Sequence, residues 1–434
     1  MVALRSPHDR EILRLAVLAL GSLAAEPLYV LVDTAIVGHL GRSQLAALGL
    51  AATVLSGLFA LFNFLQYGTT AQVARAEGAG ERRVARRLGA QALWLSLAIG
   101  LSLALAVALL AGPIVAALGG EGETGDFAVT YLQIAAFGLP FALIAIAIQG
   151  YLRGVSDLRT PLVYIAAGNA ANLVLELLFV YGFGWGIEGS AWGTVIAQAG
   201  MGVAFATKVL ADARGDRSPR RRLLGRLLTF GRPILVRTSA LYAVFVVATA
   251  VVARFGDAPL AAHNIAFQLW IFLALVLDAV AIAGQVIVGR TLGAGDAERA
   301  YDASLRMIWM SVAVGAIFAV ALLAAAQILP LVFTGDDAVI EQAELLWPIF
   351  ALMQPLNGAV FALDGILIGA GDVRYLMWSM VAASSASVAL ALLALVLDWG
   401  VVGVWSALAL LIVVRLATLG PRFRGGHWLV TGWS

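Results

Sequence analysis

Long apolar stretches separated by short polar segments fill nearly the whole chain. A helix that crosses the hydrocarbon layer of a bilayer needs about 20 apolar residues, and these stretches reach that length. The stretches are continuous and do not alternate with a period of two, so they predict helices and not the strands of a membrane barrel. About twelve membrane-spanning helices are predicted, near residues 12–38, 45–74, 89–118, 127–152, 160–181, 187–210, 227–254, 259–288, 300–333, 341–367, 375–397 and 401–420.

The segments between the predicted spans carry a strongly uneven charge. With the N-terminus inside, the inner segments hold 24 of the 28 basic residues, whereas the outer loops hold only Arg42 and Arg254 and are otherwise acidic. Because cytoplasmic loops carry the Lys and Arg excess, the pattern predicts a multi-pass protein of the cell membrane with both termini cytoplasmic. The arginines of segment 217–226 also fit a nucleic-acid patch, but a cytoplasmic loop already accounts for them, and we expect no nucleic-acid partner.

The two halves of the chain repeat each other at a nearly constant shift of 215 residues. TAIVGHLGRSQLAA (34–47) matches TAVVARFGDAPLAA (249–262), and GYLRGVSDLR (150–159) matches GILIGAGDVR (365–374). Six spans return a chain to its starting side, so the two repeats are parallel and related by an axis along the membrane normal. We therefore predict an all-α integral membrane protein with a six-helix bundle at 1–210, a cytoplasmic Arg-rich linker at 211–226 and a second bundle at 227–434.

Composition narrows the possible chemistry. Hydrophobic residues make up 62% of the chain and charged residues 12%, against roughly 25% charged in soluble proteins. The lack of cysteine excludes disulfides, thiol chemistry and Cys-based metal sites. The four histidines are too widely spread for a metal cluster, and no predicted helix offers a His/Glu metal pair or a nucleophile beside a base. We therefore expect neither enzyme activity nor a cofactor.

Ionisable side chains at membrane depth are costly and mark functional sites by default. At 1.5 Å per residue, Asp33 and Glu176 lie roughly 9 and 8 Å below the outer ends of their predicted helices, and Thr194 lies roughly 10 Å below. Asn172 is one turn from Glu176 on the same face. Together these oxygens can hold a hard cation such as Na⁺ or share a proton. Alternatively, both acids face the outer interface, and Asn172 and Thr194 make helix-to-helix hydrogen bonds.

The repeat bears on this choice. In the second half the matching positions hold Ala248, Ser387, Ala391 and Leu408 or its neighbour Ala409. A purely architectural role should recur in both halves. A polar cluster confined to one half therefore suggests a specialised site.

Other polar residues lie on helices expected to line a central cleft. They are possible substrate contacts, although packing hydrogen bonds explain each of them as well: Asn63, Gln66, Gln268, Asp278 and Asn357. Asp278 can pair with Arg237 or face the substrate. Asp364, near the inner end of its helix, is expected to be solvated. Pro27 removes a backbone donor from the first helix and permits a bend there.

Three segments carry a resemblance to a known family. They are PLYVLVDTAIVGHLG (27–41) followed by LAALGLA (45–51), and LAAHNIAFQLW (260–270). Together with the two GxxDxR turns and the 6+6 repeat, they resemble the multidrug and toxic compound extrusion (MATE) transporters, in the DinF-like branch. The resemblance implies V-shaped bundles that alternate in access and export small organic, often cationic or amphipathic compounds, driven by H⁺ or Na⁺.

The resemblance also assigns the coupling role to Asp33, Asn172, Glu176 and Thr194. In this family the acid on the fifth predicted span (160–181) is commonly Asp, and the longer side chain of Glu176 favours H⁺ over Na⁺. The acids that NorM-type members use in the second half are not evident, and Asn357 occupies the expected position on the tenth predicted span (341–367). A lipid-linked oligosaccharide flippase of the same superfamily remains the alternative, and the expected partners are organic substrates, H⁺ or Na⁺ and the bilayer, with a monomeric protein.

Overall fold

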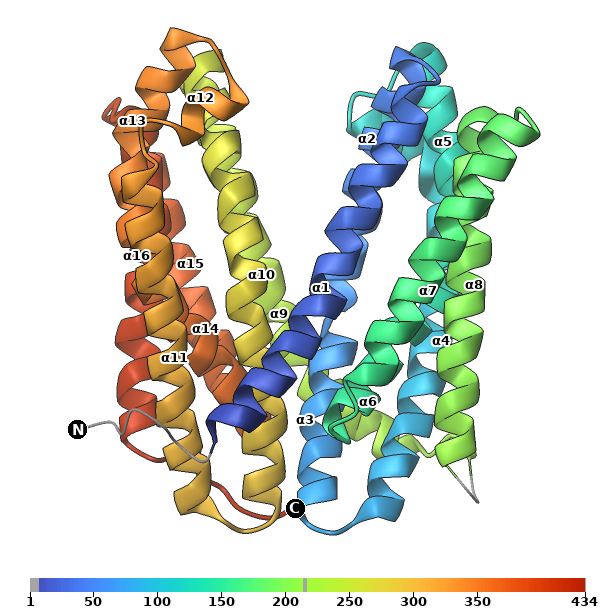
Figure 1. The fold of residues 1–434 in the computed structure, drawn as a ribbon, viewed down its shortest axis with the longest axis vertical. Coiled ribbons are helices and arrows are strands. Elements are labelled where there is room, and N and C mark those ends of the chain that lie inside the picture. Colours follow the sequence, from blue (N-terminus) through green and yellow to red (C-terminus); the bar gives the residue numbers. More distant parts are fainter. Residues whose placement is uncertain (1–7, 214–216, 434) are drawn as a thin grey trace. The chain divides into compact units, whose positions relative to one another are not determined.

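Every regular element is helical in residues 8–213 and 217–433, which are the residues that the computed structural model describes (Figure 1). The first half contains α1 (Asp9–Gly38), α2 (Arg42–Phe62), α3 (Phe64–Gly78), α4 (Arg82–Ala117), α5 (Gly122–Ala136), α6 (Leu139–Gly154), α7 (Arg159–Glu176), the π-helix η1 (Leu177–Gly182) and α8 (Gly186–Asp212). The second half contains α9 (Arg221–Val252), the 3₁₀ helix η2 (Ala253–Phe255), α10 (Asp257–Gly293), α11 (Ala297–Ala324), α12 (Leu329–Phe333), α13 (Asp337–Leu352), α14 (Gln354–Ala370), α15 (Val373–Val396) and α16 (Gly400–Arg424).

The predicted fold class is confirmed. Within the described residues, ten helices are long and apolar enough to cross a membrane, or up to twelve when two bent pairs each count as one span. The bent pairs are α5 with α6, at 55°, and α13 with α14, at 47°. Each pair corresponds to one predicted span. The second residue of each second helix is a proline, Pro140 in α6 and Pro355 in α14, and the two prolines occupy matching positions of the repeat. Proline cannot continue the preceding helix without losing a backbone hydrogen bond, which explains the break.

Contacts divide the chain into two compact units. The N-unit is Gly21–Gly231, and the C-unit is Met1–Leu20 with Arg232–Ser434. The chain passes between them inside α1 and again inside α9. The first turn of α1 belongs to the C-unit through ion pairs of Asp9 with Arg306, at 2.7 Å, and of Glu11 with Arg290.

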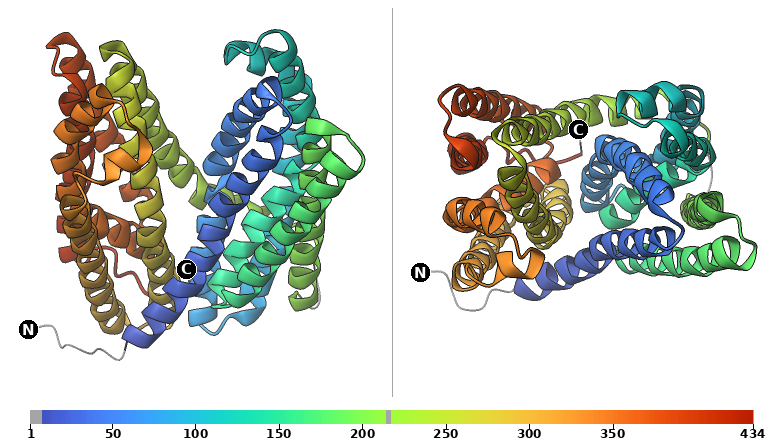
Figure 2. Two further views of the ribbon diagram at one scale, coloured as in Figure 1. Left: turned by 45° about the horizontal axis from the view of Figure 1, so that its top comes forward. Right: turned by 90° about the horizontal axis from the view of Figure 1, so that it is seen from above.

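Each unit is a bundle of long helices, which Figure 2 shows from two further directions. One helix lies at the centre of each bundle. In the N-unit α6 packs against α3, α4 and α8, and in the C-unit α14 packs against α10, α11 and α16. The two central helices occupy equivalent places in the sequence repeat. Glycines let their backbones approach the neighbouring helices closely, as small residues commonly do between membrane helices.

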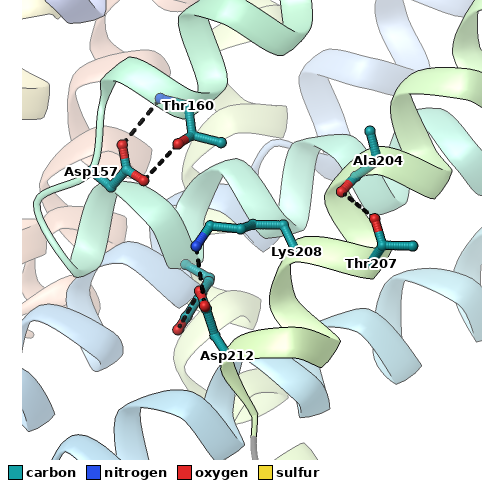
Figure 3. Close-up of polar contacts among 7 residues, drawn as sticks. Asp157, Thr160, Ala204, Thr207, Lys208 and Asp212 are labelled. Atoms are coloured by element: carbon teal, nitrogen blue, oxygen red, sulfur yellow. Dashed lines mark hydrogen bonds and ion pairs between the residues drawn. The ribbon is translucent and has the colours of Figure 1, made fainter.

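The turn between α6 and α7 is held by side-chain capping. Asp157 accepts hydrogen bonds from the backbone N and the Oγ1 of Thr160, at 3.0 and 2.7 Å (Figure 3). The same view shows Lys208 donating to Asp212 at 3.0 Å. At the equivalent turn of the C-unit, Asp372 instead accepts a hydrogen bond from Arg422 at 2.6 Å. The repeated Asp therefore stabilises its turn in both units, but through different partners.

Candidate functional site

The four residues predicted to couple transport to an ion lie together inside the N-unit. Asp33 comes from α1, Asn172 and Glu176 from the last turns of α7, and Thr194 from α8. Asp33 is 5% exposed, Asn172 3% and Glu176 0%, while Thr194 is half-buried. Neither acid therefore faces the outer interface, so this alternative for the two carboxylates is wrong.

Ser190, which the sequence pattern did not single out, joins the two acids. Its hydroxyl lies 2.8 Å from Asp33 Oδ1 and 2.9 Å from Glu176 Oε1, and the side chain is fully buried. A serine hydroxyl carries one hydrogen, so it can donate to only one of the two carboxylates at a time. The other contact is favourable only if that acid is protonated and donates to Ser190, or if a cation joins the group. Two ionised carboxylates therefore do not satisfy this arrangement, which needs one positive charge in addition, as a proton or a cation.

A second layer of polar groups surrounds this trio. Thr194 Oγ1 accepts a hydrogen bond from Asn172 Nδ2 at 3.1 Å and lies 2.9 Å from the hydroxyl of Tyr29 on α1. Tyr131 of α5 interacts with the hydroxyls of Ser190 and Thr194. Four helices therefore converge on one buried polar cluster.

Two acceptor oxygens in the cluster remain unused. Asn172 Oδ1 and Glu176 Oε2 are buried and find no hydrogen-bond partner among the described residues. A buried acceptor without a donor costs about 1–3 kcal/mol, so a proton or a cation bound here would offset part of that cost. Within the same residues no group of three or more His, Cys, Asp or Glu side chains could hold a metal ion, so any cation would rely on the two acids and neutral oxygens.

Local backbone features place Glu176. It is the last residue of α7, directly before the π-helix η1, and π-helical turns occur frequently at functional sites. Gly193 of α8 lies against it, since a Cβ at that glycine would come within 3.2 Å of Glu176 Cγ and of its backbone N. The small residue leaves room for the glutamate side chain.

The other predicted polar residues are distributed over both units. In the N-unit Asn63 lies at the junction of α2 and α3, and the buried Gln66 donates to Gln149 at 3.3 Å. In the C-unit Gln268 is exposed. Asp278 is half-buried and its side chain is not without a partner. Asn357 is fully buried and donates to Gln354 at 3.3 Å. Gln66 and Asn357 thus make packing hydrogen bonds within their own units.

The structure corrects the expectation for Asp364. Its side chain was expected to be solvated, but the residue is 6% exposed and forms ion pairs with both Arg237 and Arg415. Arg415, one of the 24 basic residues that the charge pattern assigns to the inner segments, is 3% exposed inside the C-unit. The sequence does contain a sign of this burial, because Arg415 is the single charged residue in the apolar run ALLIVVRLATL (409–419). Counting the basic residues of the loops does not reveal it. Pro27 lies within the continuous helix α1, as predicted, and is exposed.

Comparison with known proteins places the chain in a family. The MatE family model matches residues 19–178 and 233–393, once in each half. Protein DETOXIFICATION 44, chloroplastic, of Arabidopsis thaliana is 31% identical over 440 residues, which cover 98% of this chain and 84% of the relative. DNA damage-inducible protein F of Escherichia coli is 30% identical over 448 residues, which cover 100% of this chain and 95% of the relative. A probable multidrug resistance protein NorM of Deinococcus radiodurans is 30% identical over 436 residues, which cover 95% of this chain and 94% of the relative.

Solved structures share the fold. A crystal structure of MATE in the bent conformation superimposes with a TM-score of 0.89 at 20% identity, covering 97% of this chain and 95% of that one. The bent form of the Vibrio cholerae MATE transporter VcmN gives 0.88 at 21% identity, with 97% and 98% covered. The predicted MATE resemblance is therefore confirmed, and the chain belongs to the MatE family of multi-pass membrane transporters.

Proposed function

We propose that this protein is a proton-coupled antiporter that exports small organic compounds by alternating access. The observation that carries the proposal is the Ser190 hydroxyl between the carboxylates of Asp33 and Glu176, at 2.8 and 2.9 Å. This buried trio is confined to one half of the repeat, as expected of a coupling site and not of architecture. The names of several relatives, which are multidrug resistance proteins, support small organic substrates.

The geometry of the trio favours H⁺ over Na⁺. Both contacts of Ser190 have ordinary O–H···O lengths, and one added proton satisfies both of them. A hard metal cation instead needs several oxygens arranged around it at similar distances. Thr194 Oγ1 already accepts from Asn172 and contacts the Tyr29 hydroxyl. Among the described residues this leaves Asn172 Oδ1 and Glu176 Oε2 as the unpartnered oxygens of the cluster, fewer than such a shell needs.

In the membrane we place two six-helix bundles, 1–210 and 227–434, joined by a cytoplasmic linker at 211–226, with both termini cytoplasmic. This orientation rests on the basic residues of the inner segments. It puts the acid pair nearer the outer side, since Asp33 precedes the end of α1 by five residues, or roughly 8 Å. Protons can then enter from outside and drive export.

Transport into proteoliposomes under a single imposed gradient tests the coupling ion. With rhodamine 6G as the probe, we expect a pH gradient without sodium to drive accumulation of the dye and a sodium gradient at constant pH to have no effect. Empty liposomes control for passive dye movement. Accumulation driven by the sodium gradient alone would contradict proton coupling.

We further propose that one proton on the acid pair bends α1 at Pro27. Protonation removes the repulsion between the two carboxylates and their need for hydration, so the surrounding helices can close on them. Pro27 makes the bend possible because α1 already lacks one backbone hydrogen bond there. Proton and substrate then compete because each favours a different arrangement of the N-unit, and not because they share contacts.

Pro27→Ala separates this mechanism from direct competition at the carboxylates. The variant restores the missing backbone donor, so we expect it to bind rhodamine 6G but to lose most of the pH dependence of that binding. Fluorescence polarisation of the dye with purified protein, at acidic and at alkaline pH, measures the effect. An unchanged pH dependence in Pro27→Ala would reject the bending mechanism and leave the acid pair itself as the coupling site.

A further inference from the structure

A second cluster of buried charges lies in the C-unit. Asp364 of α14 forms ion pairs with Arg237 of α9 and Arg415 of α16, and both guanidinium groups contact the same carboxylate atom, Oδ2. The side chains of Arg237, Asp364 and Arg415 are 11%, 9% and 4% exposed. We call these three residues the charged triad.

The triad is incompletely satisfied. Two arginines face one carboxylate, so the three side chains carry a net charge of one positive unit. Asp364 Oδ1 and Arg237 Nε are both buried and find no hydrogen-bond partner in the described part of the chain. An arginine bound in a fork by two carboxylate oxygens would use both groups, and that arrangement is the stronger one. The guanidinium of Arg237 therefore keeps an unused donor beside an excess positive charge.

The position of the triad makes a purely structural role costly. Arg237 precedes the end of α9 by fifteen residues, or roughly 22 Å, and Arg415 precedes the end of α16 by nine, or roughly 14 Å. Charged side chains at membrane depth are rare and commonly mark the path of a substrate or ion. Burying an ion pair is seldom stabilising by itself, and a second buried arginine adds a further desolvation cost.

The repeat argues against an architectural requirement as well. At the shift of 215 residues, Arg237 and Asp364 correspond to Ser22 and Gln149, and Arg415 corresponds to Gly200 or the adjacent Met201. The N-unit therefore folds around the equivalent central helix without any charge at these places. The triad is a feature of one half, as the acid pair is of the other, and its net charge has the opposite sign.

We propose that Arg237 and Arg415 form a binding site for the carboxylate or phosphate group of an organic anion, and that Asp364 is the resident counter-ion which the ligand displaces. This inference rests on the proposed function and names a substrate class for it, amphipathic anions and zwitterions. The ligand approaches from the side of Arg237, the most exposed of the three side chains. One ligand oxygen accepts from Arg237 Nε, the donor that Asp364 leaves unused, and the other replaces Asp364 Oδ2.

Two dyes with the same xanthene ring and opposite charge test the proposal, anionic carboxyfluorescein and cationic rhodamine 6G. Fluorescence polarisation measures their binding to the full-length protein purified in an uncharged detergent. Arg237→Gln should weaken carboxyfluorescein binding by at least about tenfold, because it removes a charge-assisted hydrogen bond. Asp364→Asn should tighten it by about tenfold, because the competing carboxylate is gone. Rhodamine 6G binding should change much less in both variants.

The pair Arg422 and Asp372 supplies matched controls in the same unit. Its ion pair at 2.6 Å lies outside the triad, so Arg422→Gln and Asp372→Asn make the same charge changes elsewhere. Opposite effects of Arg237→Gln and Asp364→Asn, with small effects of the controls, support the anion site. Equal weakening by both triad variants would assign the triad a structural role, and equal shifts in the controls would assign the effect to overall charge; either result overturns the proposal.

Measurements on the unmodified protein keep the proposal testable if a triad variant fails to fold. Benzoate should displace carboxyfluorescein and benzylamine should not; equal displacement by the two, or none by benzoate, would overturn the anion site. Added phosphatidylglycerol should not displace the dye, since displacement would make a lipid phosphate the occupant instead of a substrate. Dye binding is measured at constant pH without any imposed gradient, so a failure of coupled transport is distinguishable from a failure of anion binding.

Discussion

Asp33→Asn is expected to lower transport driven by a pH gradient by about two orders of magnitude, the upper range of coupling effects between sites. Asparagine keeps the size of the side chain and its contact with Ser190, but it cannot take up and release a proton. Glu176→Gln should have a comparable effect, since the two carboxylates share one hydroxyl. The measurement is dye accumulation in proteoliposomes under an imposed pH gradient.

The loss should not come from unfolding. Replacing one of two buried, mutually repelling acids by a neutral isostere removes a desolvation cost, so the thermal midpoint should be unchanged or higher. Ala248→Ser, at the position that the repeat equates with Asp33, is the matched control in the other half and should transport normally. If Asp33→Asn accumulated dye at the normal rate under a pH gradient, the acid pair could not be the coupling site.

Ser190 gives a finer measurement on the same site. Ser190→Ala leaves both acids in place but removes the hydroxyl that bridges them, so the pH profile of transport should shift while some transport remains. Ser190→Thr keeps the hydroxyl, so its pH profile of transport should match that of the unmodified protein. A role in packing alone would change the thermal midpoint in Ser190→Ala without moving the pH profile.

Gly365→Ala is expected to lower the stability of the protein by about 3 kcal/mol, the upper range for overpacking a core. Gly365 lies where α14 crosses α10, and a Cβ there would lie 2.6 Å from the Cα of Ala281, which is backbone and cannot turn away. The repeat-related Gly150 of α6 should behave similarly, because its Cβ would lie 3.0 Å from the Cα of Gln66. Thermal denaturation of the detergent-purified protein, followed by size-exclusion chromatography, measures the change.

Gly49→Ala is the matched control for this prediction. Gly49 is also within a helix, α2, but a Cβ there would meet no atom of a neighbouring helix within 4 Å. Alanine is the better helix former, so this variant should be as stable as the parent or slightly more so. If Gly365→Ala and Gly49→Ala denatured at the same temperature, close backbone approach would not explain the central position of α14.

The sequence by itself determined the features that depend on position along a helix axis. Apolar runs of sufficient length predicted the membrane-spanning helices, and the shift of 215 residues predicted the repeated halves that the family model matches separately. Depth is also an axial property, because each residue advances a helix by a constant rise. For this reason the chain's own residue order is enough to predict that Asp33, Asn172, Glu176 and Thr194 share one level.

Only the tertiary structure decided which side chains face one another across helices. Ser190 lies one turn before Thr194, yet nothing in the sequence shows that its hydroxyl falls between the two acids. The same limit explains the error at Asp364, where distance from the helix end suggested solvation but packing of α9, α14 and α16 encloses the carboxylate between Arg237 and Arg415. Rotation of each helix about its own axis, and the choice of its neighbours, depend on contacts between residues far apart in the chain, and these contacts form only when the bundle packs.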